Sequence, residues 1–222
     1  MNTTPMFPLG TVVLPGMPLP LRIFELRYQL MLHDVMAGDQ KFGVVLIERG
    51  SEVGGGDSRS NVGTLVRIYQ HQAMDEGQHA ILAFGEERIR VEKWLPDDPY
   101  PRAEVSVWPD GAHATADDSV DSIPHDGTSN DAELLGMYAK CISSLRHLLA
   151  TAAELGHQVA PSTFEAPEDP VSGSYLLAAL TPVGPFDKQR LLTVPGAQDR
   201  LPLLASLIVD QLDLITGEAT QG

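Results

Sequence analysis

The segment from 109 to 130 divides the chain into two halves whose hydrophobic residues follow different patterns. It holds almost no large apolar side chain and no Lys or Arg, and aspartate recurs from Asp110 to Asp131. Such a segment cannot offset its ordering entropy by burial. The sequence therefore predicts a β-rich unit over 1–108, a flexible acidic linker over 109–130 and a helical unit over 131–222.

Before the linker, short apolar runs alternate with Gly, Pro or acidic turns, which is typical of strands about five to six residues long. Phe42–Ile47 is a continuous apolar run and suits a strand covered on both faces. Polar and apolar residues alternate in Arg88–Glu92 and Ala103–Val107, as in strands with one wet face. Asp75–Gly77 fits a hairpin turn. Many short strands with tight turns indicate a closed or nearly closed barrel.

Helical periodicity occurs once in the first half and throughout the last third. Apolar residues from Phe24 to Met36 recur every three or four positions and stop at Gly38, which predicts a helix that caps the barrel. The helices expected after the linker run from Asp131 to about Gly156, Val171–Leu180, Asp187–Val194 and Asp199–Ile215, with the three aspartates as N-caps. The expected fold class is α+β, a barrel of about six strands followed by a small helical bundle.

The net charge, the first residues and the cysteine count restrict the compartment and the kinds of partner that we expect for this chain. The chain has 15 Lys+Arg against 30 Asp+Glu, a formal charge of 15 − 30 = −15, which repels phosphate backbones and anionic lipids. No run approaches the roughly 20 apolar residues that span a bilayer, and Met1–Pro5 does not resemble a signal peptide. A single cysteine, Cys141, excludes a disulfide framework and fits a reducing compartment. We expect a cytoplasmic protein that binds neither membrane nor, in general, nucleic acid.

No motif for catalysis or for a cofactor stands out. Gly54–Gly56 lacks the Lys-Ser/Thr of a phosphate loop, and no Gly-x-Ser-x-Gly elbow occurs. His71, His79 and Asp75 are the one metal-like grouping, but two histidines and a mobile carboxylate on an exposed hairpin are better interpreted as ordinary surface residues. Cys141, beside an apolar helix face, is expected to be a partly buried, unreactive thiol. The sequence thus predicts no enzyme, no cofactor and no metal.

The segment Met17–Leu21 has two interpretations. Met17, Pro18 and Leu19 form an apolar stretch stiffened by prolines, which suits a recognition surface that binds at low entropic cost. The alternative is a loop tucked against the barrel. Both stay open at this point.

The most specific signal is a series of short motifs in a fixed order. They are Phe7–Gly10, Val12–Gly16, Pro20–Tyr28, Phe42–Leu46, Val62–Thr64, Gly85–Val91, Pro101–Val105, Asp187–Leu192 and Arg200–Leu201. In order and spacing they resemble the amino-terminal substrate-binding domain of Lon proteases. The resemblance covers the chain apart from 109–130, and no Walker motif or serine-lysine peptidase segment occurs.

The resemblance implies a PUA-like barrel of six strands followed by a helical subdomain, which recognises other proteins or unfolded polypeptide segments. Without ATPase and peptidase motifs, degradation by this chain alone is excluded, and the expected function is ATP-independent protein binding in quality control. Two other functions stay open: RNA binding, because PUA-like barrels elsewhere bind RNA, and a small-molecule sensor at the barrel mouth.

The resemblance also suggests one structural pair. Glu25 lies in the predicted first turn of the helix, and both its motif and that of Arg88 belong to one barrel, so we expect Arg88 to reach Glu25. If the two residues were not coupled, Glu25 and Arg27 would become candidates for the binding surface, and Arg27 joins Met17, Pro18 and Leu19 as a candidate.

Overall fold

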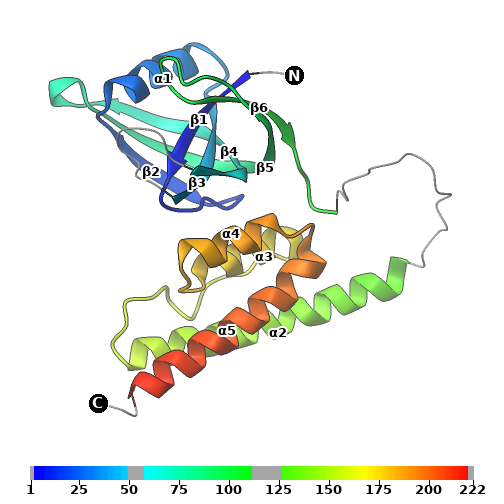
Figure 1. The fold of residues 1–222 in the computed structure, drawn as a ribbon. Coiled ribbons are helices and arrows are strands. Elements are labelled where there is room, and N and C mark those ends of the chain that lie inside the picture. The colour runs from blue at the N-terminus through cyan, green and yellow to red at the C-terminus, as the bar shows by residue number, and fades with distance from the viewer. Residues whose placement is uncertain (1–2, 50–57, 112–126, 220–222) are drawn as a thin grey trace. The chain divides into compact units, whose positions relative to one another are not determined.

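The computed structural model describes residues 3–49, 58–111 and 127–219, and the chain forms two compact units, Met1–Pro109 and Asp110–Gly222 (Figure 1). The glycines at 54–56 and most of the predicted linker, 112–126, lie outside the described residues.

Within the described residues, six strands make up the sheet of the first unit. They are β1 (Thr3–Leu9), β2 (Pro18–Ile23), β3 (Lys41–Arg49), β4 (Ser58–Ala73), β5 (His79–Trp94) and β6 (Arg102–Val107). The sheet order is β2-β5-β4-β3-β1-β6, and β6 also pairs with β5. Five strands therefore close into a ring, with β2 outside it against one half of β5 (Figure 1). The expected barrel of about six strands is confirmed, although it closes unevenly.

The two longest strands bend so that each serves two parts of the sheet. In β5, His79–Phe84 pairs with β2, whereas Ile89–Trp94 pairs with β6. The pairing of β4 with β5 shifts between Leu65 and Val66 and again between Ile68 and Gln70, and such bulges bend and twist a strand. The turn between β4 and β5 is a short 3-10 helix, η1 (Asp75–Gly77), with Gly77 at φ +72°. The predicted hairpin is therefore confirmed.

Side chains alternate between two apolar clusters, one on each face of the sheet. The inner cluster, enclosed by the ring, consists of Met6, Val45, Ile89, Val91 and Ala103, with Leu65, Trp94 and Val105 packed against it. The outer cluster lies under helix α1 (Leu26–Ala37), where Tyr28 stacks on Phe7 with ring centroids 4.1 Å apart. The helix predicted from Phe24 begins at Leu26, and Gly38 ends it as expected.

Gly63 shows why one of the quoted motifs needs glycine. A Cβ there would overlap the carbonyl of Val44 on the neighbouring strand. β3 and β4 therefore lie so close together here that only glycine fits at position 63.

β2 forms in spite of its two prolines because of the direction in which their backbone groups point. Gly85 N donates to Met17 O at 2.9 Å, and the register pairs Leu19 with Ala83. Alternate residues therefore hydrogen-bond to β5, while the backbone of Pro18 and Pro20 points to the free edge, where a missing N–H breaks no ladder bond. Met17–Leu21 is thus mostly an edge strand, which corrects its interpretation as a loop, while its role as a recognition surface stays a prediction.

The described part of the second unit contains four helices, as predicted: α2 (Gly127–Glu154), α3 (Pro170–Leu180), α4 (Pro185–Thr193) and α5 (Ala197–Ala219). The long helices α2 and α5 lie side by side and run in the same direction (Figure 1). The buried residues of the two helices include Tyr138, Cys141, Leu145, Leu148 and Leu149 of α2 and Leu201, Leu204, Leu207 and Ile208 of α5. In the described ranges, no helix is both long and apolar enough to cross a membrane.

The predicted N-caps are wrong by a few residues. Asp131 lies inside α2, whereas Asp187 and Asp199 lie in the first turns of α4 and α5. A carboxylate is favourable in the first turn as well as at the cap, because both positions face the positive end of the helix dipole. The cap that forms is Asp169, which accepts from Val171 N at 3.2 Å and Ser172 N at 2.9 Å at the start of α3.

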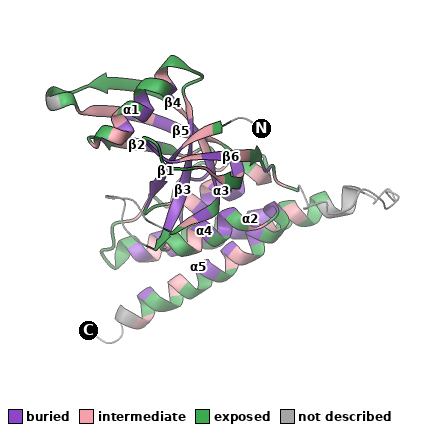
Figure 2. Cartoon of the chain, turned by 45° about the horizontal axis from the view of Figure 1, so that its top comes forward, coloured by how far each residue is buried: buried purple, intermediate pink, exposed green. Residues whose placement is uncertain are grey.

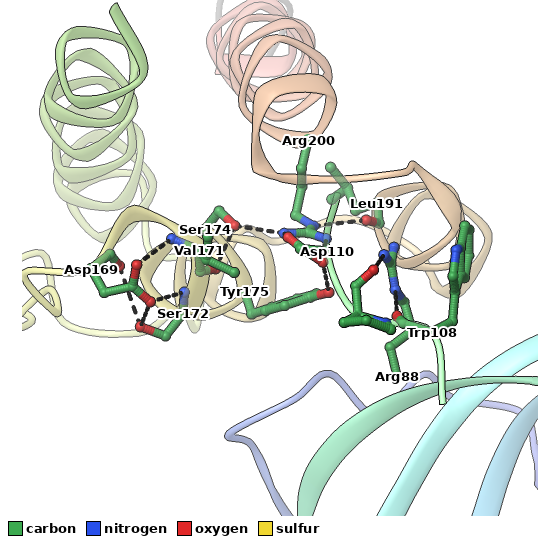
Figure 3. Close-up of polar contacts among 11 residues, drawn as sticks. Arg88, Trp108, Asp110, Asp169, Val171, Ser172, Ser174, Tyr175, Leu191 and Arg200 are labelled. Carbon is green, nitrogen blue, oxygen red and sulfur yellow. Dashed lines mark hydrogen bonds and ion pairs between the residues drawn. The ribbon is translucent and has the colours of Figure 1, made fainter. Parts of the chain in front are cut away.

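A buried ion pair connects the beginning of the second unit to its helices (Figure 3). Arg200 donates through Nη1 and Nη2 to both oxygens of Asp110, at 2.8 and 2.9 Å, and the Arg200 side chain has no exposed surface. Ser174 Oγ and the Leu191 carbonyl accept its other hydrogen bonds. Tyr175 lies under the guanidinium and donates its hydroxyl to Asp110 at 2.6 Å. Asp110 is therefore packed, which corrects its assignment to a flexible linker.

Candidate partner-binding surface

Only some of the predicted surface residues are exposed. Pro18 is exposed and Met17 is half-buried, but the Leu19 side chain is 6% exposed and belongs to the outer core cluster. Alternation along β2 turns Leu19 toward the core when Pro18 and Pro20 face outward. Leu19 is therefore removed from the candidate binding residues, and for Met17 and Pro18 a binding role stays a prediction.

The predicted pair between Glu25 and Arg88 does not form. Glu25 accepts from Arg27 Nε at 3.1 Å, two residues away. Arg88 is buried, donates from Nε to the Trp108 carbonyl at 2.9 Å, and lies with its guanidinium carbon 3.9 Å from the Trp108 ring centroid (Figure 3). Arg88 thus connects β5 to the segment that follows β6. Arg27 is half-buried, with its guanidinium also over the Tyr28 ring.

Large apolar side chains are instead exposed around the start of α1 and the β4–β5 turn. They are Phe24 (57% exposed), Leu26 (71%), Leu30 (44%) and Met74 (40%). We call these four residues the α1–hairpin surface. Figure 2 shows exposed residues along α1 and along the hairpin tip beside it. An apolar group of this kind is typical of a protein interaction site.

The sheet register brings these residues to one end of the barrel. His79 on β5 pairs with Ile23 on one side and with Ala73 on the other. Phe24 follows Ile23 directly and Met74 follows Ala73, so the chain leaves β2 and β4 at the same end. Leu26 and Leu30 are four residues apart and therefore share one face of α1.

Gln29 holds the start of α1 in place. Its Nε2 donates to the Phe24 carbonyl at 2.8 Å, and its Oε1 lies 3.9 Å from where a Cβ on Gly77 would stand. The turn η1 and the first turn of α1 are therefore neighbours. The α1–hairpin surface is built on hydrogen-bonded backbone and not on a long loop.

The histidines of the predicted hairpin face each other. His71 Nε2 and His79 Nδ1 are 2.9 Å apart, which is hydrogen-bond distance. Asp75 lies in η1 and does not join them in a metal site, since no group of three or more His, Cys, Asp or Glu that could hold a metal is found within residues 3–49, 58–111 and 127–219.

Cys141 is more deeply buried than the sequence predicts. The side chain is 2% exposed, and Sγ donates to the Leu201 carbonyl at 3.4 Å. Burial raises the pKa of the thiol to about 11, so the thiolate is scarce at neutral pH. This environment suits a structural cysteine.

A six-stranded barrel unit followed in the chain by a four-helix unit, counted within the described residues, is a fold with solved examples. The chain is similar to the Lon N-terminal domain protein from Xanthomonas campestris, with TM-score 0.61, 24% identity, and coverage of 93% of this chain and 98% of that one. It is also similar to the N-terminal domain of Mycobacterium avium complex Lon protease, with TM-score 0.64, 18% identity, and coverage of 94% and 99%. The fold is therefore that of Lon N-terminal domains.

Residues 3–210 match the family described as the ATP-dependent protease La (LON) substrate-binding domain, and the chain belongs to this family. Curated relatives include a Lon protease of Desulfosudis oleivorans, 33% identical over 106 residues, which are 46% of this chain and 13% of the relative. Lon protease 2 of Myxococcus xanthus is 27% identical over 206 residues, 92% of this chain and 23% of the relative. A LON peptidase N-terminal domain and RING finger protein of Schizosaccharomyces pombe is 24% identical over 218 residues, 90% and 43%. The chain thus spans less than half the length of these relatives.

Proposed function

We propose that this chain is a non-catalytic module that binds exposed apolar segments of other polypeptides, without ATP, through the α1–hairpin surface. The observation that carries the proposal is the group of large apolar side chains left exposed at one end of the barrel, in a family of substrate-binding domains. Unfolded chains expose side chains of the same kind, whereas folded surfaces seldom present them together.

The composition of the surface favours weak, reversible binding. Complete burial of a Leu or Phe side chain is worth about 1.5–3 kcal/mol, and these side chains are between 40% and 71% exposed when free. Much of that gain is offset by the cost of ordering the bound segment. A module that binds many unrelated sequences and releases them needs such an affinity.

The edge of the sheet also favours binding through side chains over binding by addition of a strand. β2 is the edge strand among the described strands, and the outward positions Pro18 and Pro20 lack the N–H donors that an added strand would use. An extended segment is therefore not expected to join the sheet, which leaves contacts with the exposed side chains.

Electrostatics disfavour the RNA-binding alternative. The barrel unit, residues 1–109, contains 10 Lys+Arg and 14 Asp+Glu, hence 10 − 14 = −4, and the whole chain carries −15. A phosphate backbone would be repelled by both.

A labelled, permanently unfolded protein and the purified full chain test the proposal by fluorescence anisotropy. We expect Leu26→Glu to weaken binding about fivefold or more, because a carboxylate at the most exposed apolar position must be desolvated on binding. Val209→Glu on α5, where Val209 is 55% exposed, is the matched control and should bind like the parent chain. Equal losses in the two variants, or retention of RNA with steep salt dependence and of no unfolded chain, would overturn the proposal.

A further inference from the structure

A pocket of about 500 Å³ opens at the mouth of the barrel, apart from the residues of the α1–hairpin surface. It lies where β1 and β3 begin and where β6 ends, and is lined by Thr3, Thr4, Pro5, Asp39, Lys41, Leu65, Ile89, Val105 and Val107. Its volume falls within the range of about 300–1,000 Å³ typical of small-molecule sites.

One side of the pocket is apolar. Ile89, Leu65 and Val105 belong to the inner cluster of the ring or pack against it, so the floor of the pocket is the end of the barrel core. Val107 stands at the rim and is 53% exposed. An aliphatic group of a ligand would cover this apolar surface and be removed from water.

The other side is polar and is lined by one ammonium, that of Lys41, and one carboxylate, that of Asp39. Lys41 Nζ lies 2.6 Å from Glu86 Oε2, and Arg67 Nε lies 2.5 Å from Glu86 Oε1, so both carboxylate oxygens are engaged. Asp39 Oδ1 accepts from the backbone N–H of Lys41 at 3.1 Å, and the Asp39 carbonyl accepts from Arg67. An ammonium has three hydrogens, so Lys41 can serve Glu86 and a ligand together.

Glu86 remains ionised in this setting. Burial tends to raise its pKa, but the hydrogen bonds from Lys41 and Arg67 outweigh burial and lower the pKa below its ordinary value. The carboxylate therefore fixes the two cations in place, and Lys41 is also one of the residues that line the pocket.

We propose that the barrel mouth is a second binding site, which takes an aliphatic group bearing a carboxylate: the carboxyl-terminal residue of a polypeptide, or a free carboxylic acid. The aliphatic part lies on Leu65, Ile89 and Val105, and the carboxylate accepts from Lys41. Charge-assisted hydrogen bonds are roughly twice as strong as neutral ones, so Lys41 selects an acid over its amide. The site does not depend on polypeptide binding at the α1–hairpin surface, because the two sets of residues share no member.

Four probes separate the two sources of the carboxylate: acetyl-Gly-Gly-Leu and its carboxyl-terminal amide, and octanoate and octanamide. Binding to the full chain is followed by amide chemical shifts in two-dimensional NMR, which also locate the site. We expect saturable shifts at Leu65, Ile89 and Val105 with an acid, and about tenfold weaker binding of the matching amide. Binding of the peptide acid alone identifies a polypeptide end, binding of octanoate alone identifies a free acid, and binding of both establishes the shared chemistry.

Two pairs of variants test the role of charge without loss of the fold. Val107→Glu should bind the acid about tenfold more weakly than Val107→Gln, which has a similar shape without the charge. Lys41→Gln should abolish the preference for acid over amide, whereas Lys93→Gln, at an exposed position on the same barrel, should keep it. Equal binding of acid and amide by the parent chain, equal effects within either pair, shifts confined to the α1–hairpin surface, or no saturable binding of any probe would each overturn the proposal. Loss of this site would leave the binding of unfolded chains, and its sensitivity to Leu26→Glu, intact.

Discussion

Replacement of Asp110 by alanine should destabilise the helical unit by about 3–5 kcal/mol, the usual cost when a buried ion pair loses one partner. The Arg200 side chain has no exposed surface and Asp110 is 10% exposed, so the orphaned guanidinium cannot reach water without local opening. It would keep hydrogen bonds to Ser174 and the Leu191 carbonyl, but neither carries a countercharge. Tyr175 would also lose its hydroxyl acceptor, which adds roughly 1 kcal/mol.

Urea denaturation of the full chain measures this loss, with far-UV circular dichroism reporting mainly the helices. Fluorescence reports the barrel unit, because Trp94 and Trp108, the two tryptophans of the sequence, both belong to it. Asp187→Ala is the control: its partner Arg190 is 60% exposed, and such a surface pair is worth about 0–1 kcal/mol. The double variant D110A/R200M should lose much less than the sum of the two single losses. Additive losses, or a loss below about 1 kcal/mol for Asp110→Ala, would refute a buried, coupled pair.

Further predictions concern single groups in both units. Burial and the hydrogen bond to Asp34 raise the pKa of Tyr100 from 10.0 to about 12. The stability that comes from keeping this hydroxyl protonated is therefore complete below pH 10 and is lost as the pH rises from 10 to about 12. Tyr100→Phe should remove this part of the alkaline loss of stability, which pH-dependent denaturation measures. Cys141, whose thiol pKa is raised to about 11 by burial, should react with a thiol reagent at pH 8 on the order of a hundredfold more slowly in the folded chain than in urea. Gly136→Ala should stabilise α2 by up to about 1 kcal/mol, because a Cβ there meets open space. Gly173→Ala should destabilise α3, because the new Cβ would overlap an aromatic side chain of α2. Thermal denaturation should therefore show a higher melting temperature for the first variant and a lower one for the second.

Periodicity alone predicted most of the barrel and all four helices of the second unit, because alternation and 3.6-residue repeats record which face of each element is buried. It missed β1 and misread β2, and both contain prolines: Pro5 and Pro8 in β1, Pro18 and Pro20 in β2. A proline counts against a strand unless its backbone points to an open edge or lies at an irregular position. That direction depends on the neighbouring strand, which no local pattern reveals.

The candidate site was harder to predict, for a related reason. Leu26 and Leu30 lie off the inward stripe of α1, and the sequence shows only that they are apolar. Their value as a surface comes from the approach of the β4–β5 turn, a contact between segments about fifty residues apart. Arg88 was paired with the wrong residue because its partners are backbone carbonyls at Trp108 and Pro109, and any residue type supplies a carbonyl.

The prolines of β2 also bear on what happens when many copies of the chain are crowded together. A bare strand edge can pair with strands of other chains and so seed their stacking into fibrils. Pro18 and Pro20 lack backbone N–H donors at two successive positions that face the open edge. Another strand therefore cannot form a regular hydrogen-bonded pair with β2. The same residues that make the strand hard to recognise in the sequence therefore disfavour edge-to-edge association between copies of this chain.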